Sequence, residues 1–180
     1  MNAKGLGFVI GLIIGLILVV ILFRFANTDK KLKTEYDERQ EKVRGKAYKY
    51  AFYTALAVQA LLCTASICQI EIPIEDYILH FIGILFGCLV LGAYCIWNGV
   101  YWGLNNDHKR YGVVFAVCIV LNLIAVVGPV MAGMLFEKDG KIGMPALNFL
   151  IIFMMAVFGI EFLIKGAIDK KTDADDMEEE

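Results

Sequence analysis

Five long apolar stretches dominate the chain, and polar residues are concentrated between them. The stretches cover residues 5–23, 51–70, 77–102, 111–136 and 145–164. Each is long enough to cross a bilayer core of about 30 Å as a helix. Lipid offers no partner for backbone N–H and C=O groups, and the stretches lack the alternation typical of strands, so they predict helices. We expect an all-α polytopic membrane protein with five transmembrane helices.

Composition agrees with this pattern, because 59% of the residues are hydrophobic, against about half in soluble domains. The first stretch exceeds the apolar core of a signal peptide, about 7–15 residues, and its positive charge follows it, so it predicts a retained anchor. The predicted organisation is an N-terminal anchor (1–27), a cytoplasmic charged helix (28–50), a four-helix transmembrane bundle (51–165) and a disordered acidic tail (166–180).

Basic residues predict the orientation in the membrane. Lys and Arg gather between the first and second stretches, after the third and after the fifth, and none lies between the second and third. Because basic loops stay on the cytoplasmic side, the N-terminus is predicted outside and the C-terminus inside. Lys138 and Lys141 favour the opposite orientation, but the Lys and Arg residues that support the predicted one are more numerous. The expected location is a prokaryotic inner membrane, crossed several times.

The segment 28–50 has the pattern of an amphipathic helix. Thr28 suits a helix N-cap. An apolar stripe recurs at 100° per residue, and its members are Leu32, Tyr36, Val43 and Ala47. This cytoplasmic stripe fits contact with the membrane interface, with a second copy or with a partner. The alternative is a solvated helix that only links two spans.

The same segment resembles a known pattern. Residues 36–40 read Tyr-Asp-Glu-Arg-Gln, and residues 43–47 read Val-Arg-Gly-Lys-Ala, just before an apolar stretch. This is similar to small uncharacterised prokaryotic membrane proteins, grouped as a domain of unknown function, in which a D-E-R-x charged helix precedes the apolar spans. The resemblance covers only this segment. It implies a prokaryotic membrane protein and supplies no catalytic residues.

Glycines of the first stretch repeat every four residues, at Gly7, Gly11 and Gly15. This small-xxx-small spacing lets helix backbones approach closely in lipid. It predicts a helix-packing interface, either within the molecule or between copies. The alternative is that these glycines simply face lipid.

Four polar residues inside the predicted spans are candidates for a polar path: Gln59, Asn98, Asn122 and Glu161. Polar groups in lipid are costly and are often functional. Lys165 follows Glu161 by four residues, the favourable spacing for an ion pair at the interface. Glu161 is therefore either a partner of Lys165 or an interior carboxylate that binds a proton or cation. The amides either join helices or line the path.

Signatures of other functions are missing from the sequence. There is no HExxH, GxSxG or phosphate-binding glycine loop, and the five cysteines form no CxxC. No enzyme activity, cofactor, metal or nucleic-acid partner is expected, and residues 105–110 are interpreted as a tight turn. The sequence favours a non-enzymatic subunit or regulator that assembles in the bilayer with itself or with another membrane protein. The alternative is a small solute or ion transporter or channel.

Overall fold

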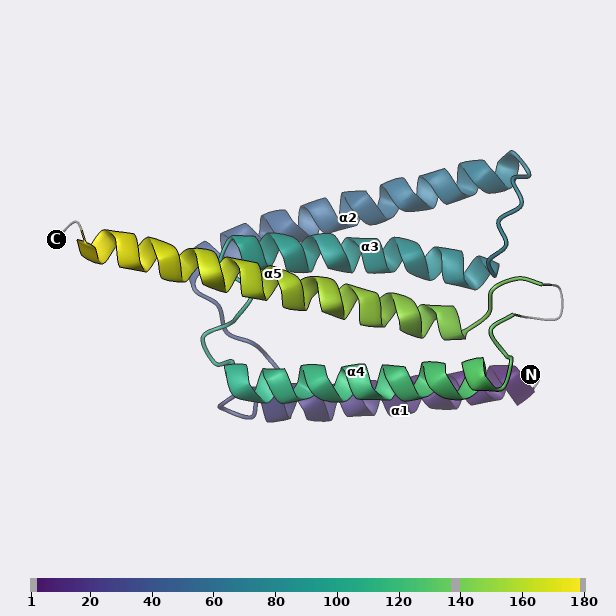
Figure 1. The fold of residues 1–180 in the computed structure, drawn as a ribbon, viewed down its shortest axis with the longest axis horizontal. Coiled ribbons are helices and arrows are strands. Elements are labelled where there is room, and N and C mark those ends of the chain that lie inside the picture. The colour runs from purple at the N-terminus through teal and green to yellow at the C-terminus, as the bar shows by residue number, and fades with distance from the viewer. Residues whose placement is uncertain (1–2, 137–139, 179–180) are drawn as a thin grey trace. The chain divides into compact units, whose positions relative to one another are not determined.

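The computed structural model describes residues 3–136 and 140–178, which form five α-helices and no strand (Figure 1). All five helices are long and apolar enough to cross a membrane. The prediction of an all-helical chain with five candidate spans is confirmed. The helices are α1 (Ala3–Ala26), α2 (Glu38–Ile67), α3 (Asp76–Trp97), α4 (His108–Met131) and α5 (Pro145–Glu178).

The chain divides into two compact units. The first comprises Met1–Asp37 and Trp102–Val117, and the second comprises Glu38–Tyr101 and Cys118–Glu180. α1 therefore belongs to the first unit, whereas α2, α3 and α5 belong to the second. α4 contributes its beginning to the first unit and its remainder to the second.

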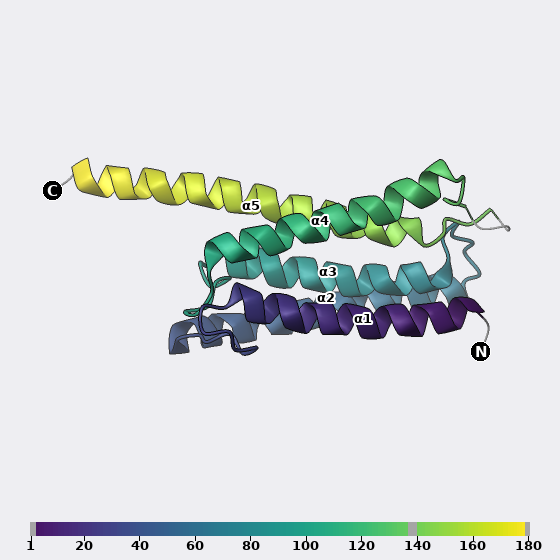
Figure 2. The ribbon, with the colours of Figure 1, turned by 90° about the horizontal axis from the view of Figure 1, so that it is seen from below.

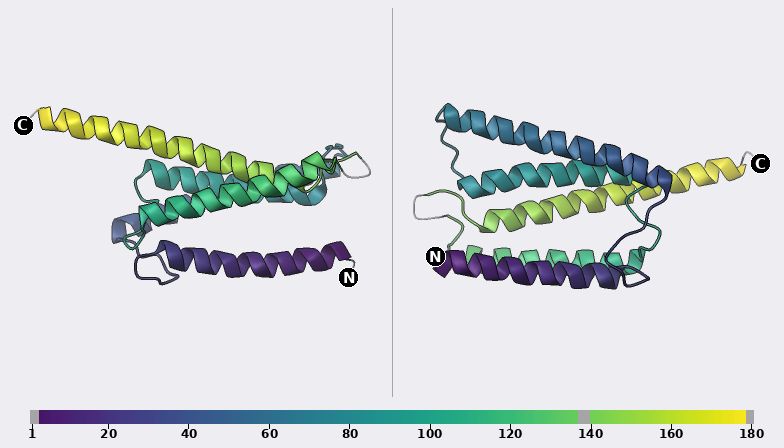
Figure 3. Two further views of the ribbon diagram at one scale, coloured as in Figure 1. Left: turned by 60° about the horizontal axis from the view of Figure 1, so that its bottom comes forward. Right: turned by 180° about the vertical axis from the view of Figure 1, so that it is seen from behind.

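In the second unit α3 lies between α2 and α5 (Figures 1 and 3). Its glycines make this arrangement possible. A Cβ atom at Gly87 would lie 3.1 Å from the Ala51 carbonyl oxygen and 3.3 Å from Ala55 Cβ, so α2 and α3 approach backbone to backbone. On the other side of α3, Gly92 accommodates the ring of Phe158 from α5. The close helix packing that small residues allow in lipid is thus built into α3.

Three helices end earlier than the apolar pattern predicts, and the reason is local. Gln69, Gly99 and Gly133 follow the ends of α2, α3 and α4 with φ of 54°, 65° and 71°. At each end the next residue donates its N–H five residues back, as from Val100 to the Cys95 carbonyl at 2.9 Å. This is the Schellman ending of a helix. Hydropathy does not reveal it, because apolar residues continue past each stop.

The predicted charged helix at 28–50 differs from the structure in its first half. α2 begins only at Glu38, and the preceding residues form an irregular loop. The loop residues use their hydrogen bonds elsewhere: Thr28 N–H donates to the Asn105 carbonyl at 2.9 Å, and Glu35 N–H donates to Asn105 Oδ1 at 2.9 Å. Thr28 therefore caps no helix.

The acidic tail, predicted to be disordered from residue 166, continues α5 as far as Glu178. Lys165 Nζ binds Asp169 Oδ1 one turn later, and Thr172 Oγ1 donates to the Ile168 carbonyl at 3.2 Å. Such i, i+4 pairs support an exposed helix. Glu179 and Glu180 lie outside the described residues.

Candidate functional site

A network of polar groups joins the loop after α1 to the loop before α4, within the first unit. We call it the clasp: residues 27–35 and 103–107. Figure 2 shows the course of the two loops as a ribbon. Asn27 is completely buried. Its Oδ1 accepts a hydrogen bond from Asn106 Nδ2 at 2.8 Å, and its Nδ2 donates to the Lys31 carbonyl at 2.8 Å. The buried amide thus has both of its polar atoms satisfied.

Asn105 is the second buried amide of the clasp, with 7% of its surface exposed. Its Nδ2 donates to the Lys33 carbonyl at 3.0 Å and to both carboxylate oxygens of Asp29 at 3.3 Å. Its Oδ1 and its backbone carbonyl accept the Glu35 and Thr28 N–H groups. One side chain therefore organises most of the loop after α1, using nearly all the donors and acceptors of an amide.

Gly103 lets the two loops meet. It is buried, and a Cβ atom there would overlap the Thr34 Cγ2 methyl and lie 2.7 Å from the Glu35 carbonyl oxygen. The neighbouring Leu104 N–H donates to that same carbonyl at 2.8 Å. The position requires glycine because the contact is with backbone, which has little room to move.

Two carboxylates of the clasp have defined roles. The Lys31 N–H, at 3.0 Å from Asp29 Oδ1, lowers the pKa of Asp29 below its ordinary value of 3.8, and Asn105 acts in the same direction. This contribution to stability is therefore present above pH 3.8 and is lost as the pH falls through the lowered pKa. Asp107 Oδ1 accepts the Lys109 and Arg110 N–H groups at 3.0 and 3.2 Å, which makes it the N-cap of α4.

The glycine face predicted on α1 is open. A Cβ atom at Gly11 or Gly15 would meet no atom within 4 Å, in contrast to Gly83 and Gly87 of α3. The surroundings of Gly7 lie outside the described part of the chain. Glycines four residues apart thus occur on both α1 and α3. A neighbouring helix packs on those of α3, whereas none lies against Gly11 or Gly15 of α1.

The predicted polar path is not assembled as a continuous chain. Gln59 binds His80, donating from Nε2 to its carbonyl at 3.0 Å while Oε1 lies 2.9 Å from its Nδ1. Asn98 donates to the Tyr94 carbonyl at 2.7 Å, about 27 Å further along α3 by helix rise. Asn122 donates to the Cys118 carbonyl of its own helix at 2.8 Å. Each amide therefore bonds a group outside the predicted path, and these bonds do not join one member of the path to another.

Glu161 differs from these amides. Lys165 pairs with Asp169, not with Glu161. Glu161 Oε2 is buried and has no hydrogen-bond partner among the described residues. Phe158 and Phe162, which pack on Gly92 and Tyr101 of the second unit, lie on the same face of α5. A buried polar atom without a hydrogen-bond partner costs about 1–3 kcal/mol.

The cytoplasmic stripe is divided between the two units. Leu32 is 52% exposed in the loop, and Tyr36 lies against Gly103. Val43 and Ala47 belong instead to the core of the second unit, where Ala47 is fully buried with Cys95 and Val100. The residues that recur at 100° per residue therefore lie in two different environments. Val43 and Ala47 pack inside the second unit, whereas Leu32 is exposed in the loop.

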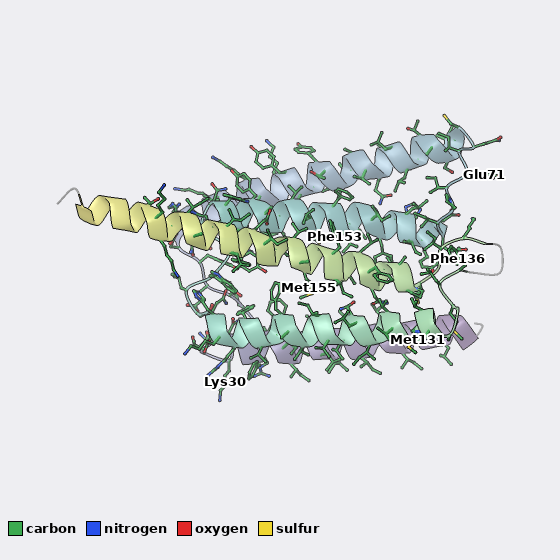
Figure 4. All side chains as sticks on the ribbon, viewed as in Figure 1. Lys30, Glu71, Met131, Phe136, Phe153 and Met155 are labelled. Carbon is green, nitrogen blue, oxygen red and sulfur yellow. The ribbon has the colours of Figure 1, made fainter. Side chains whose placement is uncertain are left out.

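A cavity of about 740 Å³ opens between the end of α2 and the start of α3. Its charged lining consists of Glu71 (Figure 4), Asp76 and Lys141. No group of three or more His, Cys, Asp and Glu side chains within the described residues is arranged to hold a metal ion. Lys138, which weighed against the predicted orientation, lies outside those residues.

Residues 105–110, predicted to be a tight turn, instead begin with three residues of the clasp. The sequence signals for it are two adjacent amides followed by a capping aspartate, and another asparagine four residues after the first apolar stretch. Comparison of the chain with protein-family models, curated proteins and solved structures finds no match. The structure's own geometry is therefore the basis for a functional conclusion.

Proposed function

We propose that the chain is a non-enzymatic subunit or regulator of a prokaryotic inner membrane, and that it assembles through α1 with a second copy or another membrane protein. The observation that carries this proposal is the open glycine face at Gly11 and Gly15. The glycines of α3 are covered by neighbouring helices within the chain, whereas those of α1 have space for one.

The physics of helix association in lipid supports this choice. Lipid tails are as apolar as leucine, so helices associate chiefly through close packing, and small residues four apart allow it. The surrounding side chains of α1 are apolar and about half exposed, for example Leu12 at 53% and Leu16 at 59%. A second helix laid on the glycine face would gain backbone contacts that lipid tails make less well.

The arrangement of loops supports the proposed orientation. Alternating spans require the loops after the second and fourth helices to share one side of the membrane. Within the second unit Ile142 N–H donates to the Pro73 carbonyl at 3.0 Å, and Glu75 N–H donates to the Ile142 carbonyl at 3.2 Å. The clasp joins the loops after α1 and α3 in the same way. The segments that contain and flank the clasp, residues 24–49 and 108–110, are rich in Lys and Arg, which favours the cytoplasmic side.

The decisive variant is Gly11→Leu, whose side chain fills the centre of the open face. We expect association in mild detergent or in vesicles to weaken by at least about tenfold, or about 1.4 kcal/mol, while the melting temperature of the monomer stays unchanged. Light scattering coupled to gel filtration gives the mass of the protein, whose single chain is 20.1 kDa.

Gly159→Leu on α5 is the matched control, because it also places leucine in an open helical position. It leaves association unchanged if the α1 face is specific. If the wild type and Gly11→Leu have the same mass, and this mass exceeds that of a single chain, the interface lies elsewhere. A wild type that stays monomeric in vesicles would remove the assembly proposal.

A second candidate function, a small ion transporter or channel, is favoured by one observation. Glu161 Oε2 is buried without a partner, and this is how a carboxylate that takes up a proton or cation within a bundle would be held. The candidate ranks second because Gln59, Asn98 and Asn122 donate to backbone carbonyls and do not continue a path from Glu161.

Glu161→Gln separates the two functions, because the amide keeps the shape of the side chain and removes its charge. Under the assembly proposal, vesicles containing the wild type or this variant have the same proton and cation permeability, measured with an internal pH dye and with potassium release. A flux carried by the wild type and abolished by Glu161→Gln would move the transporter to first place.

A further inference from the structure

Three basic side chains and one aromatic ring surround a cavity of about 320 Å³ at the end of α1 and the start of α4. Its lining is Arg24, Phe25, Lys30 and Arg110. All four residues belong to the first unit. Figure 4 shows Lys30 on the outside of the ribbon at the end of α1. We call this cavity the basic pocket.

The cations of the basic pocket are held in place by the backbone. Arg24 Nε donates to the Lys30 carbonyl at 3.2 Å, and Arg110 Nη1 donates to the Phe25 carbonyl at 3.4 Å. The Arg110 guanidinium also lies over the Phe25 ring, 5.8 Å from its centroid. These contacts fix both arginines and leave their other guanidinium N–H groups to bind an anion.

The pocket carries more positive charge than its surroundings neutralise. Asp107 pairs with Arg110 at 3.2 Å. Among the residues that the structure describes, neither Arg24 nor Lys30 forms an ion pair. The nearby Asp29 binds Lys31 and Asn105 instead. About two positive charges therefore face the cavity without a carboxylate of the chain to balance them.

The backbone at Lys30 positions this residue at the basic pocket. Lys30 has φ of 56°, a conformation that is unfavourable for a side chain other than glycine, asparagine or aspartate. Its N–H donates to the Asn27 carbonyl at 3.2 Å, and its carbonyl receives Arg24. The clasp therefore holds this residue in a strained turn that brings it beside Arg24 and Phe25.

The basic pocket lies where a lipid headgroup would be found. It is at the end of the candidate span Val9–Ala26 and at the beginning of the candidate span His108–Met131. One turn before Phe25 on α1 and one turn after Arg110 on α4, Ile21 and Val113 are 55% and 54% exposed. A phosphate in the pocket would thus have apolar surface next to it for an acyl chain.

We propose that the basic pocket binds the phosphodiester of an anionic phospholipid in the leaflet to which the clasp belongs. The bound chemistry is a phosphate held by guanidinium and ammonium donors. The Phe25 ring and the exposed apolar side chains favour a lipid over free phosphate. This site is independent of assembly through the α1 glycines.

The test uses the full-length protein in mild detergent with phosphatidylglycerol added, and counts bound lipid by native mass spectrometry. Arg24→Gln/Lys30→Gln removes the two unpaired charges and keeps the Arg110 contacts with Phe25 and Asp107. Each basic group near an anionic lipid contributes on the order of a fivefold factor, so we expect at least about a tenfold loss of affinity. Lys46→Gln/Lys49→Gln removes two exposed charges of α2 outside the pocket and leaves affinity within about twofold.

One set of controls tests whether the bound phosphate belongs to an anionic lipid, and another tests whether the variant is folded. Phosphatidylcholine binds the wild type weakly, and inorganic phosphate at millimolar concentration does not displace phosphatidylglycerol. The circular dichroism spectrum and the lipid-free melting temperature of Arg24→Gln/Lys30→Gln match those of the wild type. Equal losses in the two double variants, equal binding of both lipids, or displacement by inorganic phosphate would each overturn the proposal.

Discussion

Asn105 illustrates how one buried amide organises a segment that lies far away in the sequence. Its partners Asp29, Lys33 and Glu35 are 70 to 76 residues upstream. An amide of this kind contributes to specificity because its loss leaves several buried donors and acceptors unsatisfied, each costing about 1–3 kcal/mol. Asn27 does the same with Asn106 and the Lys31 carbonyl.

Gly103→Ala tests the clasp at its most crowded point. The added methyl would overlap Thr34 and press on the Glu35 carbonyl, so we expect the clasp to lose about 1–3 kcal/mol of stability. Hydrogen exchange measured by mass spectrometry should become faster for the Glu35 and Leu104 amides. Gly112→Ala, at an open position of α4, is the control. Unchanged exchange in Gly103→Ala would mean that the two loops are not in this contact.

The clasp could not be predicted from the sequence for a physical reason. Hydropathy and periodicity report which residues share one helix face, over a few turns. The partners of Asn105 lie in a loop whose spacing of apolar residues predicted a helix. Two helices, α2 and α3, separate the two loops in the chain. The asparagines are evident in the sequence, but no pattern in the residues around them predicts that the two loops bind each other.

At the scale of the helices, α3 is the element around which the second unit is built. It presents Gly83 and Gly87 to α2 and Gly92 to α5. Its two neighbours therefore approach it closely on different faces. The sequence shows the four-residue spacing on both α1 and α3, but spacing defines a face and does not say which face has a neighbour. The spacing therefore could not show that the glycines of α3 have a neighbouring helix within the chain and that Gly11 and Gly15 of α1 do not.

Gly87→Leu tests the α2–α3 contact. The side chain would push against the Ala51 carbonyl and the Ala55 methyl, and overpacking of this kind costs about 1–3 kcal/mol or more. We expect a lower melting temperature in detergent by circular dichroism, with Gly159→Leu close to the wild type. Gly11→Leu provides the contrast, because it is expected to change the mass and not the melting temperature. Equal melting of all four proteins would contradict the close α2–α3 contact.

For the whole molecule, hydropathy was sufficient to predict five helices, because crossing lipid demands length and apolar composition and little else. It was less informative about where each helix stops. α3 ends at Trp97 and α4 at Met131, where Gly99 and Gly133 allow the chain to turn back on itself. Which end of the bundle is cytoplasmic stays a prediction from charge.

The orientation is tested by single cysteines in a variant lacking the five native ones. Glu71→Cys and Gly140→Cys should react with a membrane-impermeant maleimide added to intact cells, because the loops after α2 and α4 are predicted to be outside. Lys109→Cys, next to the clasp, should react only after the cells are opened. Labelling of Lys109→Cys alone in intact cells would show the inverted orientation, and labelling at Glu71→Cys without Gly140→Cys would contradict five alternating spans.

The clasp also has a consequence for biosynthesis. Asn27 is bonded to Asn106, 79 residues later in the chain. At a synthesis rate of about 5–20 residues per second, roughly 4–16 s pass after Asn27 is made before its partner exists. During that time α2 and α3 are made, and Asn27 has no Asn106 to bind. The first unit therefore closes late, and a chain that stops before residue 106 cannot form this hydrogen bond.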